Sequence, residues 1–314
     1  MKYGKILVTG SSGVLGYGFK KIVAKFPSTE FVFSNSSDCD LTNAGQTSSY
    51  IEKVKPDAII HLAAFSGGVA LTKKYPAKML RDNLLMTINI LEASINNDIQ
   101  KLLLTLSSGM YPPQARIPIK EEYIHEGSAH ESNYSYSYAK RIMDPAIQAY
   151  REEFGLNVIG LVPNGIFGEF DDFRFESAVM VSSLVRRFYE NIDSGEDIVV
   201  WGDGSPLREY TYAEDLANVF IWCLENYDSP DILNVGSTEE HSVKEIALII
   251  SDIMGINKNR IKFDESKPSG VHRKSTDNSN FLQISHHEYT PFREGIEKTI
   301  EWFKANYPSN VRID

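Results

Sequence analysis

Three polar residues have the types and spacing needed to move a proton to a carbonyl group. Tyr136 and Lys140 are four residues apart, so on a helix both side chains project from one face. An ammonium group beside a phenol lowers the phenol's pKa, and the phenol can then donate a proton to a carbonyl oxygen as a hydride reaches the carbon. Ser107 closes an apolar run upstream and would polarise the same oxygen. We therefore expect Ser107, Tyr136 and Lys140 to be catalytic, with Tyr136 and Lys140 also contacting the cofactor.

A glycine-rich segment near the start of the chain has the pattern of a phosphate-binding turn. It lies between a short apolar run and a stretch of helical period. Gly10 permits a sharp turn, Gly13 lets the backbone approach a pyrophosphate, and Gly16 lets the helix pack closely on the strand. The N–H groups and dipole of the helix start attract phosphate. The turn residues that we expect to bind a dinucleotide are Gly10, Ser11, Ser12, Gly13, Val14, Leu15 and Gly16.

The end of the second apolar run bears on the choice of cofactor. An acidic residue there would bind a free ribose 2′-hydroxyl and favour NAD. Here the run ends in Ser34, Asn35 and Ser36, and the first carboxylate is Asp38. Hydroxyl and amide groups can bind a 2′-phosphate without repelling it, although no Arg is present to clamp it. We therefore expect NADPH in preference to NADH, with Asp40 and Leu41 near the adenine.

The elements that must position these residues alternate along the first half of the chain. Short apolar runs typical of buried strands occur at Lys5–Val8, Phe31–Phe33, Ala58–Leu62, Leu102–Leu106 and Val158–Val162. Stretches of helical period lie between them at Val14–Lys25, Leu84–Ala93 and Tyr138–Phe154. This alternation is typical of a parallel sheet covered on both faces. The predicted fold is α/β: a doubly wound parallel sheet of the Rossmann type, followed by a smaller C-terminal α/β substrate domain.

The regular alternation stops after Pro163, which suggests a domain boundary. We expect a dinucleotide-binding domain over residues 1–163 and a mainly substrate-binding domain over 164–314. Residues 208–230 include a helical stretch, Tyr212–Leu224, that should pack back on the first domain. A last amphipathic helix is expected over Gly295–Tyr307, with Trp302 and Phe303 in the core.

Composition and charge exclude several classes of partner. The chain has 314 residues, of which 42% are hydrophobic and 24% charged, and a formal net charge of −10. Such an acidic protein disfavours nucleic acid and anionic membranes as partners. No apolar run approaches the roughly 20 residues of a membrane-spanning helix, and a strand-like run begins at once, so we expect a cytoplasmic protein. Cys39 and Cys223 form no disulfide framework, and no metal-binding spacing is present, even around His286-His287.

Taken together, these motifs resemble the extended short-chain dehydrogenase/reductase family from end to end. The shared features are the glycine-rich turn, His61-Leu62-Ala63-Ala64, Asn83, Ser107, Tyr136, Lys140, Arg208-Glu209-Tyr210 and Asp215-Leu216-Ala217. Within that family the chain resembles the GDP-L-fucose synthases most, through residues 107–112, 133–140, 167–173, 184–188 and 200–204. The resemblance implies an NADP(H)-dependent enzyme that acts on a GDP-linked 4-keto-6-deoxy sugar. It also implies cofactor contacts at Leu62, Ala63, Ala64, Asn83 and Pro163.

The sequence departs from the GDP-L-fucose synthases at the residues those enzymes use to epimerise C3 and C5 of the sugar. Where the family has a Cys and a His, this chain has Gly109 and Val179, neither of which can carry a proton. Two further family residues, an Asn and a His, are replaced by Gly165 and Phe170. We therefore predict a C4 reductase of a GDP-linked 4-keto-6-deoxy hexose or heptose that leaves C3 and C5 unchanged.

The same resemblance supplies candidates for binding the nucleotide sugar. Arg187 and Arg208 occupy positions where the family places Arg beside the diphosphate, and their planar groups suit phosphate oxygens. Arg273, in the segment 267–274, is a third candidate. Trp201 could stack near the base or pack in the core, and Asn133 could bind a sugar hydroxyl. The full set of expected substrate contacts is Ser108, Gly109, Asn133, Val179, Arg187, Trp201, Arg208 and Arg273.

Three alternatives remain open at this point. A nucleotide-sugar 4-epimerase would retain NAD, although the missing acidic residue after the second strand counts against it. A true GDP-L-fucose synthase would need substitute acid and base groups. A non-catalytic, redox-sensing binding module would have little reason to keep Ser107, Tyr136 and Lys140 together. The family also implies a homodimer formed through the helices at Leu84–Ala93 and Tyr138–Phe154.

Overall fold

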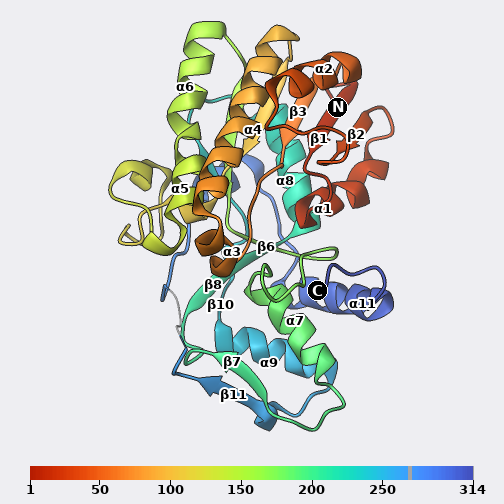
Figure 1. Ribbon diagram of the computed structural model, residues 1–314, viewed down its shortest axis with the longest axis vertical. Coiled ribbons are helices and arrows are strands. Elements are labelled where there is room, and N and C mark those ends of the chain that lie inside the picture. The colour runs from red at the N-terminus through yellow and green to blue at the C-terminus, as the bar shows by residue number, and fades with distance from the viewer. Residues whose placement is uncertain (268–270, 314) are drawn as a thin grey trace.

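A six-stranded parallel sheet is the main feature of the computed structural model, which describes residues 1–267 and 271–313 (Figure 1). Its strands are β1 (Lys5–Thr9), β2 (Glu30–Ser34), β3 (Ala58–His61), β4 (Lys101–Thr105), β5 (Val158–Pro163) and β9 (Leu233–Val235). They run in the order β2-β1-β3-β4-β5-β9, and every neighbouring pair is parallel. The chain therefore winds to one side of β1 and then to the other, which places a crevice at the carboxyl ends of the strands. The predicted Rossmann-type α/β fold is confirmed.

Helices cover both faces of this sheet because its central strands are apolar on both sides. One face is covered by α1 (Val14–Ile22), α8 (Ala213–Asn226) and α10 (Ser279–Ser285). The other face is covered by α2 (Ala44–Val54), α4 (Pro76–Asn96), α5 (Tyr134–Arg141) and α6 (Met143–Phe154). Along β1, Ile6 and Val8 point to the first set of helices and Leu7 to the second, and all three are fully buried.

The helices differ from the sequence prediction in two places. The single helix expected over Tyr138–Phe154 is two helices, α5 and α6, which meet at Ile142. Pro145 in the first turn of α6 has no N–H to bond to the preceding turn, so the helix is interrupted there. Helix α2 was missed because its sequence is polar and buries only Thr47 and Ile51.

The C-terminal half forms a smaller α/β unit below the main sheet in Figure 1. Its strands are β6 (Gly165–Phe167), β7 (Ile198–Trp201), β8 (Leu207–Tyr212), β10 (Glu240–Ser242) and β11 (Ile261–Asp264), arranged as sheets β10-β8-β6 and β11-β7. Helices α7 (Met180–Glu190), α9 (Val243–Met254) and α11 (Phe292–Asn306) pack on them, while α3 (Val69–Lys74) leads into α4. Phe303 is fully buried as expected, whereas Trp302 is only partly buried. Within the described ranges, no helix combines the length and apolarity needed to cross a bilayer.

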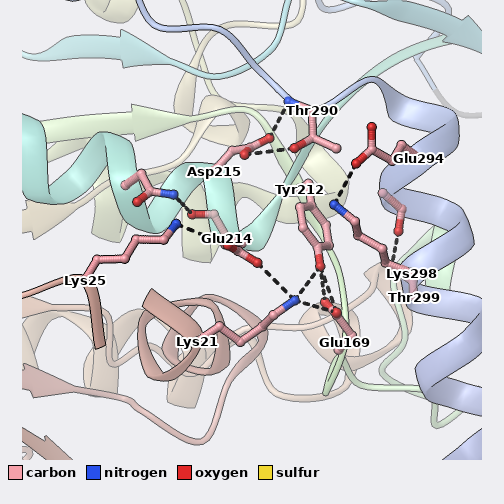
Figure 2. A network of polar contacts seen from close by, with 12 residues as sticks. Lys21, Lys25, Glu169, Tyr212, Glu214, Asp215, Thr290, Glu294, Lys298 and Thr299 are labelled. Carbon is pink, nitrogen blue, oxygen red and sulfur yellow. Dashed lines mark hydrogen bonds and ion pairs between the residues drawn. The ribbon is translucent and has the colours of Figure 1, made fainter. Parts of the chain in front are cut away.

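A buried ionic network joins the two halves (Figure 2). The Lys21 amine on α1 lies 2.7 Å from the carboxylate of Glu169, which follows β6, and 3.1 Å from that of Glu214 on α8. Lys21 also donates a hydrogen bond to the hydroxyl of Tyr212, which in turn donates to Glu169 at 2.7 Å. Lys298 of α11 lies over the Tyr212 ring. Burial of Glu169 is tolerated because these groups satisfy its charge.

We expect Lys21→Met to lower the free energy of unfolding by about 1–3 kcal/mol, because it leaves the buried Glu169 carboxylate without its cation. Lys25→Met is the matched control: Lys25 lies one turn further along in an exposed position, and among the described residues its ion-pair partner is Glu214, at 3.4 Å. Urea unfolding curves would measure both effects. Equal loss of stability in the two variants would contradict the structural role of the Lys21–Glu169 pair.

Candidate active site

A large cavity lies at the carboxyl ends of β1, β3, β4 and β5. Its volume is about 940 Å³, and both the six-stranded sheet and the C-terminal half contribute to its walls. This is the place where open parallel sheets bind their ligands, at the point where the strand order reverses. The cavity brings together most of the residues singled out from the sequence.

The glycine-rich turn is shaped by close backbone contacts and leaves one position open. Gly10 has φ +69°, and a Cβ there would lie 2.5 Å from the Ala63 nitrogen. A Cβ at Gly16 would lie 2.5 Å from the Ser11 Cα. Gly13, by contrast, caps the start of α1 without a side-chain bond, and a Cβ there would meet only the Gly10 oxygen at 3.6 Å. The turn and the helix start therefore fit the pyrophosphate of a dinucleotide.

The adenosine end of the cavity is lined by Ser34, Asn35 and Ser36. The nearby carboxylate of Asp38 is directed into the turn, where it accepts a hydrogen bond from the Asn35 N–H at 2.9 Å. The Asn35 side-chain oxygen accepts from the Ser37 N–H at 2.8 Å. Hydroxyl and amide groups, rather than a free carboxylate, thus face the ribose position.

Other predicted cofactor residues also line the cavity. They are Gly10, Ser12, Gly13, Val14, Leu15, Gly16, Asp40, Leu41, Leu62, Ala63, Ala64, Tyr136, Lys140 and Pro163. Ser11 and Asn83 do not line it in the described part of the chain. The Ser11 N–H donates to Ser34, and the buried Asn83 amide bonds both backbone groups of Phe65, at 3.0 and 2.9 Å. Asn83 therefore positions the loop after β3 instead of facing the cavity.

Ser107, Tyr136 and Lys140 meet at the centre of the cavity. Ser107 follows β4, and its oxygen accepts a hydrogen bond from the Gly109 N–H at 3.1 Å, which leaves the hydroxyl proton free to be donated. Tyr136 lies in the first turn of α5, and the Lys140 amine one turn later lies 5.9 Å from the Tyr136 ring centroid. Lys140 also donates to the Thr105 carbonyl at 2.8 Å. Helix α5 is held against the end of β4 because Ser137 donates to the Gly109 carbonyl at 2.8 Å.

Removal from water dominates the electrostatics of this group. It raises the pKa of the Tyr136 phenol to about 12, and the nearby Ser107 hydroxyl opposes this only in part. It also lowers the pKa of Lys140 to about 8. The direction for Tyr136 is opposite to the lowering expected from its spacing with Lys140, because burial is the main influence on the phenol's pKa and only the Ser107 hydroxyl lowers it. The phenol therefore holds its proton at neutral pH and is suited to donate it.

The predicted substrate residues divide into two groups. Ser108, Gly109, Asn133, Val179 and Arg208 line the cavity. A Cβ at Gly109 would lie 3.3 Å from the Ser107 oxygen and 3.5 Å from the Asn133 amide nitrogen, so this position directly adjoins the catalytic serine.

Arg187, Trp201 and Arg273 are not among the described residues that line the cavity. Arg187 donates to the Val199 carbonyl at 2.6 Å, and Trp201 is 58% exposed on β7. Arg273 is paired with Glu240 at 2.8 Å. These two hydrogen bonds hold Arg187 and Arg273 against neighbouring residues of the C-terminal half. Residues 268–270 of the segment that carries Arg273 lie outside the described residues.

Several cavity residues were not anticipated from the sequence. They are cationic or acidic groups of the C-terminal half: Asp171, Asp172, Arg174, Glu209, Lys274 and Arg312. Lys274 directly follows Arg273, and neighbouring residues of an extended segment point in opposite directions, so alternation was the signal for choosing between them. Asp171 and Arg312 carried no such signal, because they are far apart in sequence and meet only in the fold.

The fold and the Ser–Tyr–Lys cavity define a nicotinamide-dependent enzyme of the extended short-chain dehydrogenase/reductase class. The chain belongs to the NAD dependent epimerase/dehydratase family, whose sequence profile matches residues 6–236. The predicted family and the prediction of an NAD(P)H-dependent oxidoreductase are confirmed.

Particular relatives narrow this class. The chain is 36% identical to a GDP-L-fucose synthase of Dictyostelium discoideum over 307 residues, which cover 96% of each chain. A GDP-L-fucose synthetase of Naegleria fowleri solved with NADP has a TM-score of 0.91 at 33% identity, covering 98% of this chain and 96% of the other. MlghC, a GDP-mannoheptose C4 reductase of Campylobacter jejuni also solved with NADP, has a TM-score of 0.86 at 25% identity, covering 97% and 99%.

Proposed function

We propose that this enzyme uses NADPH to reduce C4 of a GDP-linked 4-keto-6-deoxy sugar and does not epimerise C3 or C5. One observation carries the proposal. Ser107, Tyr136 and Lys140 line the same cavity as Gly109 and Val179, so proton donation is provided for at the ketone but not at those two positions beside it. The GDP-sugar relatives support the substrate class, and MlghC supports a seven-carbon sugar alongside a hexose.

The catalytic residues have separate tasks in this reaction. Bound NADPH supplies the hydride that reduces the carbonyl carbon. The Tyr136 phenol donates its proton to the carbonyl oxygen as negative charge develops there. Ser107 donates a second hydrogen bond to that oxygen, since its own oxygen is already engaged by the Gly109 N–H. The Lys140 amine uses one N–H on Thr105 and has others for the cofactor ribose and the phenol.

The adenosine end supports NADPH in preference to NADH. Ser34, Asn35 and Ser36 present uncharged hydrogen-bonding groups, and the Asp38 carboxylate is turned away by its bond to Asn35. A 2′-phosphate placed there meets no opposing carboxylate from this turn, whereas a free 2′-hydroxyl loses the acidic partner that NAD enzymes provide. The NADP bound to the Naegleria relative agrees with this preference.

The diphosphate of the substrate requires cations, and the C-terminal wall provides them. Arg208 and Lys274 both line the cavity. One nitrogen of Arg208 donates to the carbonyls of Leu207 and Val271, which fixes the guanidinium plane. A fixed guanidinium suits bidentate contact with phosphate oxygens, and Lys274 adds a point charge beside it.

GDP-L-fucose synthase activity is the second candidate. It is favoured by the 36% identical relative of that name and by a carboxyl group, Asp171, that lines the cavity and could take part in proton transfer. The two candidates differ only at C3 and C5, so an isotope experiment separates them.

A homodimer is proposed on the basis of exposed apolar side chains on α4, α5 and α6. Each of the following side chains is exposed to solvent on this helical layer: Leu80, Leu85, Tyr138, Ile142 and Phe154. Helical faces of this kind are usually covered by another chain, and a twofold axis lets the same face cover itself.

We expect Tyr136→Phe to lower kcat by about 10²–10⁴-fold, because the substitution removes the proton donor. NADPH affinity should change little, since Lys140 and the glycine-rich turn are untouched. Tyr134→Phe, on the exposed start of α5, is the matched control and should keep full activity. Steady-state assays with a GDP-4-keto-6-deoxy sugar and fluorescence titration with NADPH would measure both. Near-normal turnover of Tyr136→Phe would exclude this phenol as the donor.

Turnover in deuterium oxide should place no deuterium at C3 or C5 of the product, because Gly109 and Val179 cannot exchange protons there. NMR of the product detects incorporation at each carbon. A parallel incubation of the keto-sugar without enzyme corrects for spontaneous exchange beside the ketone. Enzyme-dependent deuterium at either carbon would reject the reductase proposal and support GDP-L-fucose synthase.

We expect Ile142→Glu to give a monomer, because it places a charge on the proposed dimer face. Ile284→Glu serves as control: Ile284 is similarly exposed but lies on α10, on the other side of the sheet. Sedimentation equilibrium would distinguish the two states. A wild-type protein that is monomeric at micromolar concentration would contradict the proposed homodimer.

A further inference from the structure

One carboxyl group in the cavity has an oxygen with no partner. Asp171 lies in the loop after β6 and is only 7% exposed. Its Oδ1 accepts a hydrogen bond from the N–H of Asp172 at 2.7 Å. Its Oδ2 is buried and has no hydrogen-bond partner in the described part of the chain. A buried polar atom without a partner destabilises a protein, so its retention in a ligand cavity points to a ligand.

The loop that carries Asp171 is anchored on the side of α1. Glu169 is bonded to Lys21 and Tyr212, as described above. The ring of Phe170 stacks on Tyr17 of α1, with 5.4 Å between ring centroids and 7° between the ring planes. These contacts prevent the loop from turning outward to hydrate the carboxyl group.

Arg312, in the segment after α11, anchors the loop from its other side. Its guanidinium donates to the carbonyls of Phe170 and Asp171, at 3.1 and 3.4 Å. Its own carbonyl accepts from the Phe173 N–H at 3.0 Å, and Arg312 also lines the cavity. The loop is thus held from two regions distant in sequence, with Asp171 between them.

The surroundings of Asp171 place it at the sugar end of the cavity. Its carboxyl group interacts with Ser182, in the first turn of α7, and with Tyr210 of β8. Ser182 donates to the carbonyl of Val179, the residue that caps α7 and faces the same cavity. Asp171 therefore lies in the same wall as Val179, the position at which the resemblance to the GDP-L-fucose synthases implies a proton-transferring His in those enzymes.

We propose that Asp171 is a substrate-binding residue whose Oδ2 accepts a hydrogen bond from a hydroxyl group of the sugar, and that Arg312 is the positioning residue that holds it there. The inference rests on the proposed function, because it takes a GDP-linked sugar as the ligand. The chemistry excludes the diphosphate, and the place of Asp171 beside Ser182 and Val179 favours the sugar over the guanine base, whose N–H groups can also donate to a carboxylate. A carboxylate repels the diphosphate, which Arg208 and Lys274 serve, whereas hydroxyl groups are the neutral donors that a sugar provides.

The charge state of Asp171 gives the proposal a pH signature. Burial raises the pKa of Asp171 to about 7, and the Asp172 N–H, the Arg312 cation and the Ser182 hydroxyl offset this only in part. The Asp172 carboxylate adds to the rise, and the facing Tyr210 phenol keeps its proton because burial raises its pKa to about 12. The accepting, ionised form is therefore present above about pH 7 and is lost as the pH falls.

Calorimetric titration with GDP and with GDP-mannose, in the presence of NADP⁺, tests this directly. We expect the wild type to bind GDP-mannose more tightly than GDP at pH 8 and to lose part of that preference at pH 6. Asp171→Asn should lower the preference about tenfold and remove its pH dependence, with GDP affinity unchanged. Asp252→Asn, on the outer surface of α9, is the matched control and should behave as wild type.

Arg312→Ala leaves the carboxyl group in place and provides the second variant. It should weaken the preference for GDP-mannose and move its pH midpoint upward, because the cation that favours the carboxylate is gone. Arg293→Ala, an exposed arginine on α11, is its control. A merely structural role for Arg312 would lower thermal stability without moving the pH midpoint.

An unchanged GDP-mannose preference in Asp171→Asn would overturn the inference and leave the reductase proposal intact. If Asp171→Asn instead fails to bind GDP, the pH midpoint of the GDP-mannose preference in Arg312→Ala decides between the outcomes. A midpoint equal to that of the wild type overturns the inference, and a midpoint at higher pH supports it. Absence of NADPH oxidation with GDP-keto-sugars would overturn the proposed function alone, since the binding ratio needs no turnover.

Discussion

The ion pair between Lys21 and Glu169 joins the six-stranded sheet unit to the C-terminal unit, so that both units form walls of one cavity. A carboxylate with little access to water has to be matched by a cation, and the cation here comes from the helix that begins at the phosphate-binding turn. Glu169 is followed directly by Phe170 and Asp171, so the same contact that neutralises it also fixes part of the sugar-facing wall. The relative placement of the glycine-rich turn and of the wall that carries Asp171 is thereby set by the protein itself.

Helix α5 positions Tyr136 and Lys140 relative to Ser107. Tyr136 and Lys140 share one face of it, and Ser137, on another face, bonds to the Gly109 carbonyl in the segment after Ser107. The proton donor, the ammonium group and the serine are therefore held as one assembly at the end of β4. Gly109 adjoins this assembly without adding a side chain, so this position contributes no proton-transferring group to the cavity.

The sequence predicted the sheet, and it predicted that Ser107, Tyr136 and Lys140 lie close together, because both depend on local signals. Apolar runs marked β1, β3, β4 and β5, and a four-residue spacing placed Tyr136 and Lys140 together. What could not be predicted depends on contacts between distant segments. Arg187 and Arg273 are engaged by Val199 and Glu240, and Asp171 and Arg312 meet only through the fold. The polar helix α2 was missed for a related reason, since its position comes from packing against α4 rather than from an apolar stripe of its own.

The buried link between α1 and the loop after β6 also bears on how ligands enter. A hinge movement that parted the two units would break the Lys21–Glu169 ion pair and the stacking of Tyr17 on Phe170 together, and such an opening is energetically disfavoured. We therefore expect the cavity to keep a fixed shape rather than to open and close by a hinge movement. If the walls stay together, ligands of this cavity have to enter and leave along it from the surface, one past the other, rather than by a parting of the two units.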